Sequence, residues 1–213
     1  MSSLPPWPLL LKDGGLVLWL ILFASAVAAV VFIERFLHYH RAQINSAEFL
    51  IGVRNVLKRD NIVEALSICD ATPGPVARLV KIAILSRDRG REGVRSALEE
   101  AGLVEVPRLE EKLNVLATIA QIAPLLGLLG TVLGFIKLFA VLQHDGSFAH
   151  MPLFAQGIGE GLICTAAGLA VAIPAYVGYN YLVGRVNAIV LDMEKASSEI
   201  LNVVSESDRD RPL

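Results

Sequence analysis

Charged residues are distributed very unevenly along this chain, and this pattern constrains the fold more than any other feature. Residues 14–33 and 113–136 contain no Asp, Glu, Lys or Arg, and residues 146–184 contain only Glu160. Residues 34–112, by contrast, contain 13 Lys or Arg and 12 Asp or Glu. A helix of about 20 apolar residues crosses the hydrocarbon core of a bilayer. The sequence therefore predicts membrane-spanning segments separated by one polar domain.

The composition narrows the class of protein further. The 213 residues are 54% apolar and 19% charged. Soluble domains average about 45–50% apolar residues and roughly 25% charged residues. Three such apolar stretches, two without charge and one with only Glu160, leave too little polar surface for a soluble protein. A net charge of −2 without a basic patch argues against nucleic-acid binding, and two cysteines exclude a disulfide scaffold. We expect an all-α, three-span integral membrane protein with long second and third helices extending into the cytoplasm and a small helical cytoplasmic domain.

The positions of Lys and Arg predict the orientation of the spans. Of 19 such residues, 17 lie in 34–112 or after Gly184, so the positive-inside rule places both regions in the cytoplasm and the N-terminus outside. The first apolar segment lacks the basic start of a cleaved signal peptide, so we expect it to stay uncleaved as a membrane span. The expected order is a periplasmic N-terminus (1–15), a first helix (16–33), a cytoplasmic domain (34–112), a second helix (113–142), a short periplasmic loop (143–157), a third helix (158–183) and a cytoplasmic helical tail (184–213).

The polar domain has the pattern of short amphipathic helices. Asn61 to Glu64 has capping-box spacing, and the sequence Thr72-Pro-Gly-Pro75 is expected to end that helix. A second helix should bury one face, and a third is expected near residues 93–100. Pro107 is expected to open a helix that continues without a break to Leu142. The face expected to be buried in the second helix comprises Val76, Leu79, Val80, Ala83 and Ile84.

The tail contains apolar residues at alternating steps of four and three, interrupted by one serine. This stripe is expected to pack either against helices of the same chain or against another subunit, and its length does not distinguish the two. Its members are Val186, Val190, Met193, Ser197, Ile200 and Val204.

The second and third spans each place small residues and one threonine on one helical face. Small residues allow membrane helices to approach closely, which accounts for the glycines but not for a threonine in each stripe. Two threonines on matching faces indicate a narrow polar line facing a pore or a partner helix. The stripes are Ala120, Pro124, Gly127, Thr131 and Gly134, and Gly157, Gly161, Thr165, Gly168 and Ala172.

Glu160 is the one acidic residue within the apolar stretches. A charge at the bilayer centre costs about 2.5–3.5 kcal/mol on insertion scales, so such a residue is functional unless it lies at the membrane surface. Glu160 and Thr165 are about 140° apart on a helix, so they need not face the same cavity. Lys137 is a possible charge partner that spacing alone does not test.

Residues 124–134 (PLLGLLGTVLG) and 157–180 (GIGEGLICTAAGLAVAIPAYVGYN), with Glu34-Arg35, resemble the MotA/TolQ/ExbB proton-channel family. Three spans resemble its ExbB/TolQ branch. The resemblance implies a homopentamer whose second and third spans line a pore. It also implies a dimeric ExbD/TolR-like partner, which occupies this pore and carries the protons on an aspartate. A TonB/TolA-like protein would be a further partner. Thr131, Thr165 and Glu160 match proton-pathway positions, and Lys137 lies outside the pattern. The expected helix-packing positions are Pro124, Gly127, Gly130, Gly134, Gly157, Gly161, Gly168 and Pro174.

The function that this resemblance implies is a proton-channel or motor subunit of a bacterial inner-membrane complex. Such a complex uses the proton motive force to energise an envelope process such as TonB-dependent uptake or Tol-type outer-membrane maintenance. No enzymatic activity, cofactor or metal is expected, and the surroundings are lipid. Two alternatives remain: a passive scaffold that conducts nothing, and an intramembrane metalloenzyme using His144, Asp145 and His150.

Overall fold

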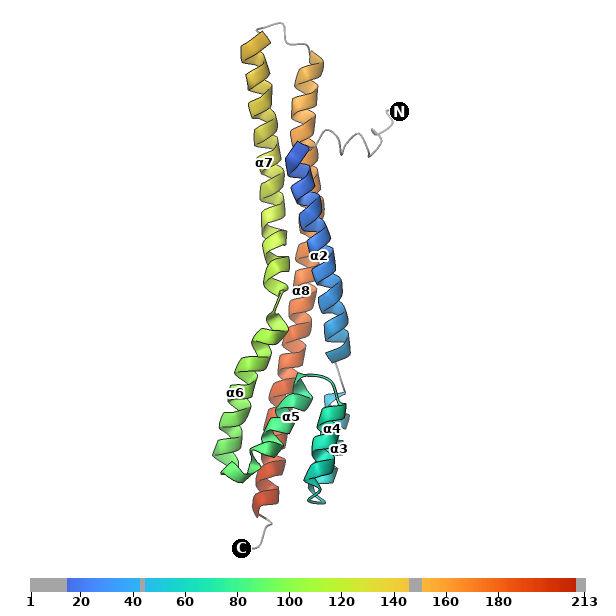
Figure 1. Ribbon diagram of the computed structural model, residues 1–213, viewed down its shortest axis with the longest axis vertical. Helices are drawn as coiled ribbons and strands as arrows, with labels where there is room; N and C mark the ends of the chain where they lie inside the picture. The colour runs from blue at the N-terminus through green and yellow to red at the C-terminus, as the bar shows by residue number, and fades with distance from the viewer. Residues whose placement is uncertain (1–14, 43–44, 146–150, 210–213) are drawn as a thin grey trace. The chain divides into compact units, whose positions relative to one another are not determined.

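The computed structural model describes residues 15–42, 45–145 and 151–209, which form helices joined by short turns (Figure 1). Three segments are long and apolar enough to cross a membrane: Gly15–Arg41, Arg87–Ala140 and Gly157–Val204. The predicted all-α fold with three candidate spans is confirmed. The helices are α2 (Gly15–Ala42), α3 (Ser46–Leu57), α4 (Ile62–Ala71), α5 (Pro75–Leu85), the short 3₁₀ helix η1 (Arg87–Arg89), α6 (Gly90–Glu110), α7 (Leu113–Asp145) and α8 (Met151–Arg209).

The chain forms two compact units. The first, which we call the three-helix unit, comprises Met1–Glu34 and Lys112–Tyr181. The second, the polar unit, comprises Arg35–Glu111 and Leu182–Leu213. Because α8 is one continuous helix of 59 residues, it contributes its first part to one unit and its last part to the other.

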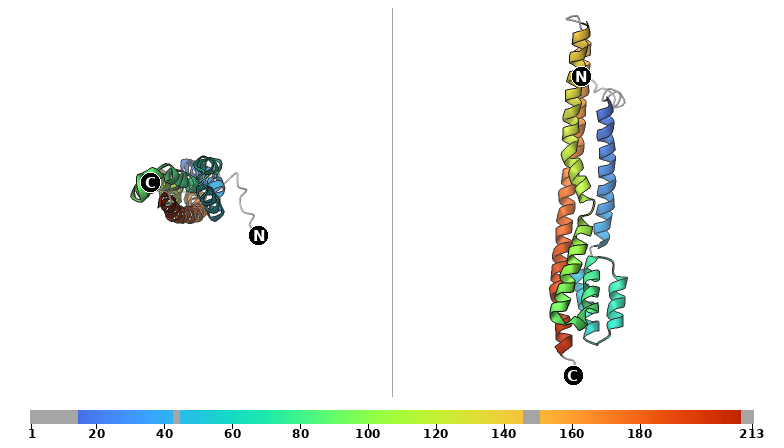
Figure 2. Two further views of the ribbon diagram at one scale, coloured as in Figure 1. Left: turned by 90° about the horizontal axis from the view of Figure 1, so that it is seen from below. Right: turned by 60° about the vertical axis from the view of Figure 1, so that its left-hand side comes forward.

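In the three-helix unit, α2 lies beside α7 and α8 (Figures 1 and 2). Val17, Leu18 and Ile21 of α2 form a buried cluster with Cys164 of α8. Large apolar side chains such as Trp19 and Phe23 remain exposed on α2. Helices that are apolar on all sides are typical of membrane spans, where lipid covers the outward faces.

The polar unit confirms the predicted short helices. Asn61 caps α4, because its Oδ1 accepts from the Glu64 backbone N–H at 3.3 Å and its Nδ2 donates to Glu64 Oε2 at 2.7 Å. The chain leaves α4 after Ala71 and starts α5 at Pro75. All five apolar residues predicted for the buried face of α5 are buried.

The tail packs against its own chain, and four of the six residues predicted for its stripe, Val186, Met193, Ile200 and Val204, are buried. Val190 and Ser197 are only half-buried and line a groove of about 390 Å³ between α6 and α8. The neighbouring residues Ile189 and Ala196 take their places, because adjacent apolar positions allow two stripes and packing selects one. The buried residues are Leu182, Val186, Ile189, Met193, Ala196, Ile200, Val203 and Val204.

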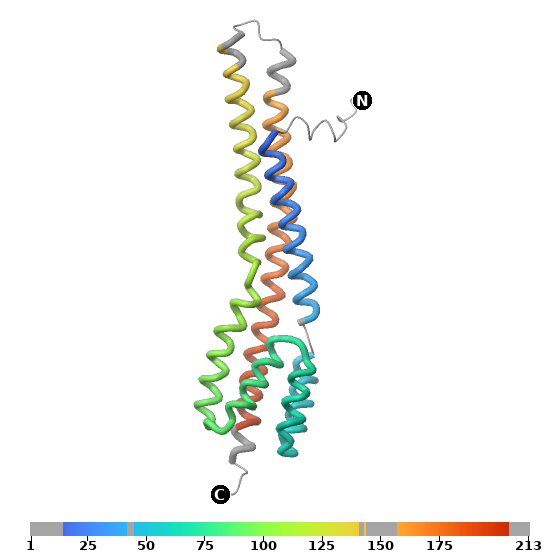
Figure 3. Tube along the Cα trace, viewed as in Figure 1, coloured from blue at the N-terminus to red at the C-terminus, as the bar shows by residue number. Residues whose placement is uncertain are grey.

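The predicted unbroken helix from Pro107 to Leu142 is wrong. Pro107 lies inside α6, which ends at Glu110, and α7 begins at Leu113 (Figure 3). Lys112 adopts a left-handed conformation with φ of 66°, which no α-helix can continue through. Lys112 Nζ donates to Glu34 Oε1 in the three-helix unit, and this ion pair favours the observed position of Lys112.

The connection between α7 and α8 is also shorter than predicted. Residues 151–157, expected to belong to a loop, form the first turns of α8. Pro152 is the second residue of this helix, a position where the missing N–H of proline costs nothing. Residues 1–14 of the expected N-terminal segment and 146–150 of the expected loop lie outside the described part of the chain.

Candidate functional site

Helices α7 and α8 approach so closely that side chains would not fit between them. A Cβ at Gly127 would lie 2.9 Å from Thr165 Cα, and one at Gly161 would lie 2.8 Å from Thr131 Cα. A Cβ at Gly168 would lie 2.5 Å from the carbonyl oxygen of Ala123. Real Cβ contacts are longer than this, so glycine is required at these positions.

The same contact continues along the helix pair. A Cβ at Gly134 would lie 2.7 Å from the Gly157 carbonyl oxygen, and one at Gly130 would lie 2.4 Å from Cys164 Cβ. Gly157 has more room, because its nearest contacts would be at 3.5 Å. Pro124 and Pro174 lie inside α7 and α8. The two stripes of small residues therefore pack against each other within one chain.

Both threonines of the stripes use their hydroxyl protons within this helix pair. Thr165 Oγ1 of α8 donates to the Gly127 carbonyl oxygen of α7 at 3.0 Å. Thr131 Oγ1 donates to the Leu128 carbonyl oxygen of its own helix at 2.6 Å. Both residues are half-buried. A hydroxyl that donates its proton keeps two lone pairs, so each threonine can still accept a hydrogen bond from water.

The contacts of α2 fall on one side of the α7–α8 pair. On α8 they involve Cys164, Ala167 and Val171, and on α7 they involve Leu126. At 100° per residue, Thr165 lies 100–160° from these α8 positions and Thr131 lies 140° from Leu126. The two threonines are therefore on the side of the pair that α2 does not cover.

The structure pairs Glu160 with Lys137 and not with the threonines. Lys137 Nζ lies 3.4 Å from Glu160 Oε2. Glu160 precedes Cys164 by four residues, so it belongs to the side of α8 that α2 contacts. Lys137 reaches the same side, because its Nζ would lie 3.9 Å from a Cβ at Gly15 of α2. The proposed charge partner of Glu160 is thus confirmed by geometry.

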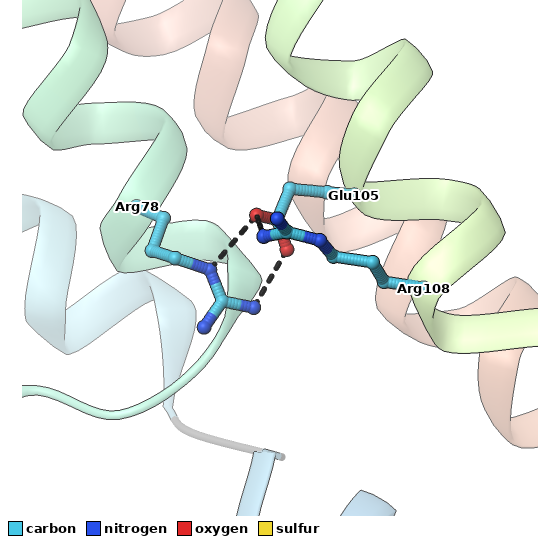
Figure 4. A network of polar contacts seen from close by, with 3 residues as sticks. All are labelled: Arg78, Glu105 and Arg108. Carbon is cyan, nitrogen blue, oxygen red and sulfur yellow. Dashed lines mark hydrogen bonds and ion pairs between the residues drawn. The ribbon is translucent and has the colours of Figure 1, made fainter. Parts of the chain in front are cut away.

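A buried carboxylate in the polar unit was not singled out from the sequence. Glu105 of α6 accepts from Arg78 Nε at 3.0 Å and Arg78 Nη2 at 2.6 Å, and from Arg108 Nη1 at 3.1 Å (Figure 4). The three-residue spacing of Glu105 and Arg108 was a signal for half of this network. Because both carboxylate oxygens are satisfied, the network joins α5 to α6 and offers no free group for catalysis.

Metal and thiol chemistry find no support in the described part of the chain. Its residues contain no group of three His, Cys, Asp or Glu side chains placed to hold a metal. His150 and the side chains of His144 and Asp145 lie outside what the structure describes. Cys69 is buried, and burial raises the pKa of its thiol to about 11, which keeps it protonated and unreactive at neutral pH.

The helices and their packing define the class of protein first: a multi-pass helical membrane protein with a glycine-packed pair of long helices. Comparison with known proteins identifies the family. The family model "MotA/TolQ/ExbB proton channel family" matches residues 72–195, which is more than half of the chain. The chain belongs to this family, as the resemblance of its membrane motifs predicted.

Individual relatives agree with the family match. The chain is 28% identical over 195 residues to the biopolymer transport protein ExbB of Neisseria gonorrhoeae, covering 85% of this chain and 87% of that protein. It is 39% identical over 113 residues to the Tol-Pal system protein TolQ of Haemophilus influenzae, covering 53% of this chain and 49% of that protein. A Methanothermobacter thermautotrophicus protein named as an ExbB homologue is 31% identical over 178 residues, and the match covers 83% of this chain and only 62% of that protein.

Proposed function

We propose that this chain is the proton-channel subunit of an inner-membrane complex that uses the proton motive force to energise an envelope process. The process would be TonB-dependent uptake or Tol-type outer-membrane maintenance, and the chain itself would not be an enzyme. The observation that carries the proposal is the position of Thr131 and Thr165, half-buried on the side of the α7–α8 pair that α2 leaves uncovered. Membership of a proton channel family supports it.

The proposed assembly is a homopentamer in which α7 and α8 of each copy line a central pore. The membrane crossings would be 16–33, 113–142 and 158–183, with the N-terminus periplasmic and the polar unit and C-terminus cytoplasmic. A dimeric ExbD/TolR-like partner would place its single spans in the pore and supply the proton-carrying aspartate, and a TonB/TolA-like protein would transmit the output. Residues 113–136 and 161–181 contain no acidic residue, which is consistent with an acid supplied by another chain.

The chemistry of the helix pair suits this role. Each threonine oxygen is free to accept from water, so a hydroxyl line can order water without the cost of a buried charge. One proton crossing the membrane releases about 2.3 kcal/mol per 100 mV, so a few protons can drive movement of a partner helix.

Glu160 is proposed as the acidic member of the proton pathway. It lies five residues from Thr165, which is about 7.5 Å along the helix axis, but on a different side of α8. We therefore infer that Glu160 acts on protons through the local charge that it sets together with Lys137 near the periplasmic end of the pore, and that it does not share a water molecule with the threonines.

The test replaces each threonine by valine, which removes the hydroxyl at nearly constant volume. Thr131→Val and Thr165→Val should abolish the energised output, measured as partner-dependent uptake or as outer-membrane integrity, while the complex still assembles. Thr118→Val is the matched control, because Thr118 Oγ1 also donates to a carbonyl oxygen of its own helix, that of Asn114 at 2.7 Å. Normal output from both Thr131→Val and Thr165→Val would contradict the proposal.

A passive membrane scaffold is the second candidate. It is favoured by the finding that the glycine stripes already have a packing role within one chain and that both threonine protons are already bonded there. A scaffold needs the glycines but not the hydroxyl lone pairs, so the same valine variants separate the two functions.

A further inference from the structure

The Lys137–Glu160 ion pair has an isolated position in the three-helix unit. Lys137, Asp145 and Glu160 are the charged residues of the sequence between Leu113 and Tyr181. The ammonium and carboxylate of the pair are 3.4 Å apart. Lys137 lies six residues beyond Thr131, or about 9 Å along the helix axis. Among the residues that the structure describes, the pair therefore carries the charges nearest to the threonines on the proposed periplasmic side.

The two members of the pair differ in their surroundings. The Lys137 side chain is 66% exposed, whereas the Glu160 side chain is only 20% exposed. A long lysine stem can move its charge to the membrane surface, whereas the Glu160 side chain is mostly buried. Removal of the Lys137 side chain therefore changes the local charge without opening a cavity. This removal leaves Glu160 as an uncompensated negative charge.

We propose that Lys137 acts through Glu160 to limit the rate at which protons enter the α7–α8 pathway, because its ammonium cancels the carboxylate charge. This inference rests on the proposed proton-channel function. A bare carboxylate at this position attracts protons and other cations, and a bare ammonium repels them. A unit charge at about 9 Å changes the local proton occupancy by about twofold at the permittivity of water and about twentyfold at an effective permittivity of 20.

The alternative is that the ion pair merely ties α7 to α8. The two possibilities predict different directions for the change in proton flux when one charge is removed. If the pair is a tie, removal of either partner weakens the assembly and lowers proton flux in both cases. If Lys137 acts by cancelling charge, the two single neutralisations have opposite effects, and removing both charges restores the neutral state.

The experiment measures passive proton flux in inverted membrane vesicles that contain the whole complex, using a pH-sensitive dye and normalising to the amount of assembled protein. Lys137→Met should raise the flux at least about twofold and Glu160→Gln should lower it by a similar factor. The double variant Lys137→Met/Glu160→Gln should give a flux between those of the two single variants, and the conservative variant Lys137→Arg should behave like wild type. Lys195→Met, the same substitution at an exposed position of the tail, should change nothing.

Each result decides whether Lys137 acts by cancelling charge or only ties α7 to α8. Lower flux in both single variants, or an unchanged flux in Lys137→Met, overturns the role proposed for Lys137 while leaving the channel intact. Wild-type flux no greater than that of vesicles lacking the chain overturns the proposed channel function, and the inference with it. Opposite signs with recovery in the double variant support the inference.

Discussion

The close contact between α7 and α8 predicts a specific penalty for Gly168→Ala. The added Cβ would lie 2.5 Å from the Ala123 carbonyl oxygen and 3.1 Å from Gly127 Cα. Both atoms belong to the backbone of α7, so no flexible side chain can move aside and the helices must separate. Overpacking of this kind costs about 1–3 kcal/mol. Separation also stretches the nearby hydrogen bond from Thr165 to Gly127, which is 3.0 Å long.

Helix propensity opposes this penalty and must be removed from the comparison. Alanine is more favourable than glycine in a helix interior by about 1 kcal/mol. Gly159→Ala is the matched control, because Gly159 lies in the same helix and a Cβ there would meet nothing within 4 Å. The difference in stability between the two variants isolates the contact, and it should equal about 1–3 kcal/mol in favour of Gly159→Ala.

The assay is thermal unfolding of the purified protein in detergent micelles, followed by circular dichroism at one fixed protein concentration, because assembly makes the midpoint concentration-dependent. Equal midpoints for the two variants would show that α7 and α8 do not approach as closely as described. A lower midpoint for Gly159→Ala would refute the argument outright.

Two further predictions concern the polar unit and the helix break. Burial raises the pKa of the Cys69 thiol from 9.0 to about 11, so the folded protein keeps this proton at pH values where the unfolded chain loses it, and the free energy of unfolding should fall as pH rises from about 9 to about 11. Alkylation of Cys69 in the folded protein should accelerate only above about pH 10. Rapid labelling at pH 8 would contradict the burial of this thiol. Lys112 is strained at φ of 66°, so the Lys112→Gly variant should be more stable than Lys112→Ala by about 1–2 kcal/mol in chemical denaturation. Both variants lose the ion pair to Glu34, so this loss cancels in the comparison. Equal stabilities would show that the backbone at residue 112 is not left-handed.

Much of the fold was predictable because it depends on local physical rules. Uncharged apolar length identified the three spans, and the capping pattern at Asn61 and the apolar spacing in α5 identified helices of the polar unit. These signals require only the residues within one helix. They do not depend on how distant segments meet.

The features that the sequence did not predict all depend on tertiary contacts. No glycine or proline marks the break at Lys112, which instead coincides with an ion pair to Glu34, a residue 78 positions away. Lys137 was named as a possible partner of Glu160, but testing that pairing and finding the bond from Thr165 to Gly127 both require the register of α7 against α8, which no single helix specifies. Two of the six tail-stripe positions, Val190 and Ser197, were misplaced because apolar residues also occupy the neighbouring positions Ile189 and Ala196.

The glycine contact between α7 and α8 has a consequence for biogenesis. Because most glycines of the two stripes are engaged inside one copy, the two helices can form a finished hairpin as soon as each has entered the bilayer. Copies would then associate as preformed pieces, using the larger side chains that remain on the outer faces, such as Leu128, Phe135 and Leu169. We therefore expect substitutions on those faces to alter the number of copies in the assembly, and glycine substitutions to reduce the yield of folded monomer instead.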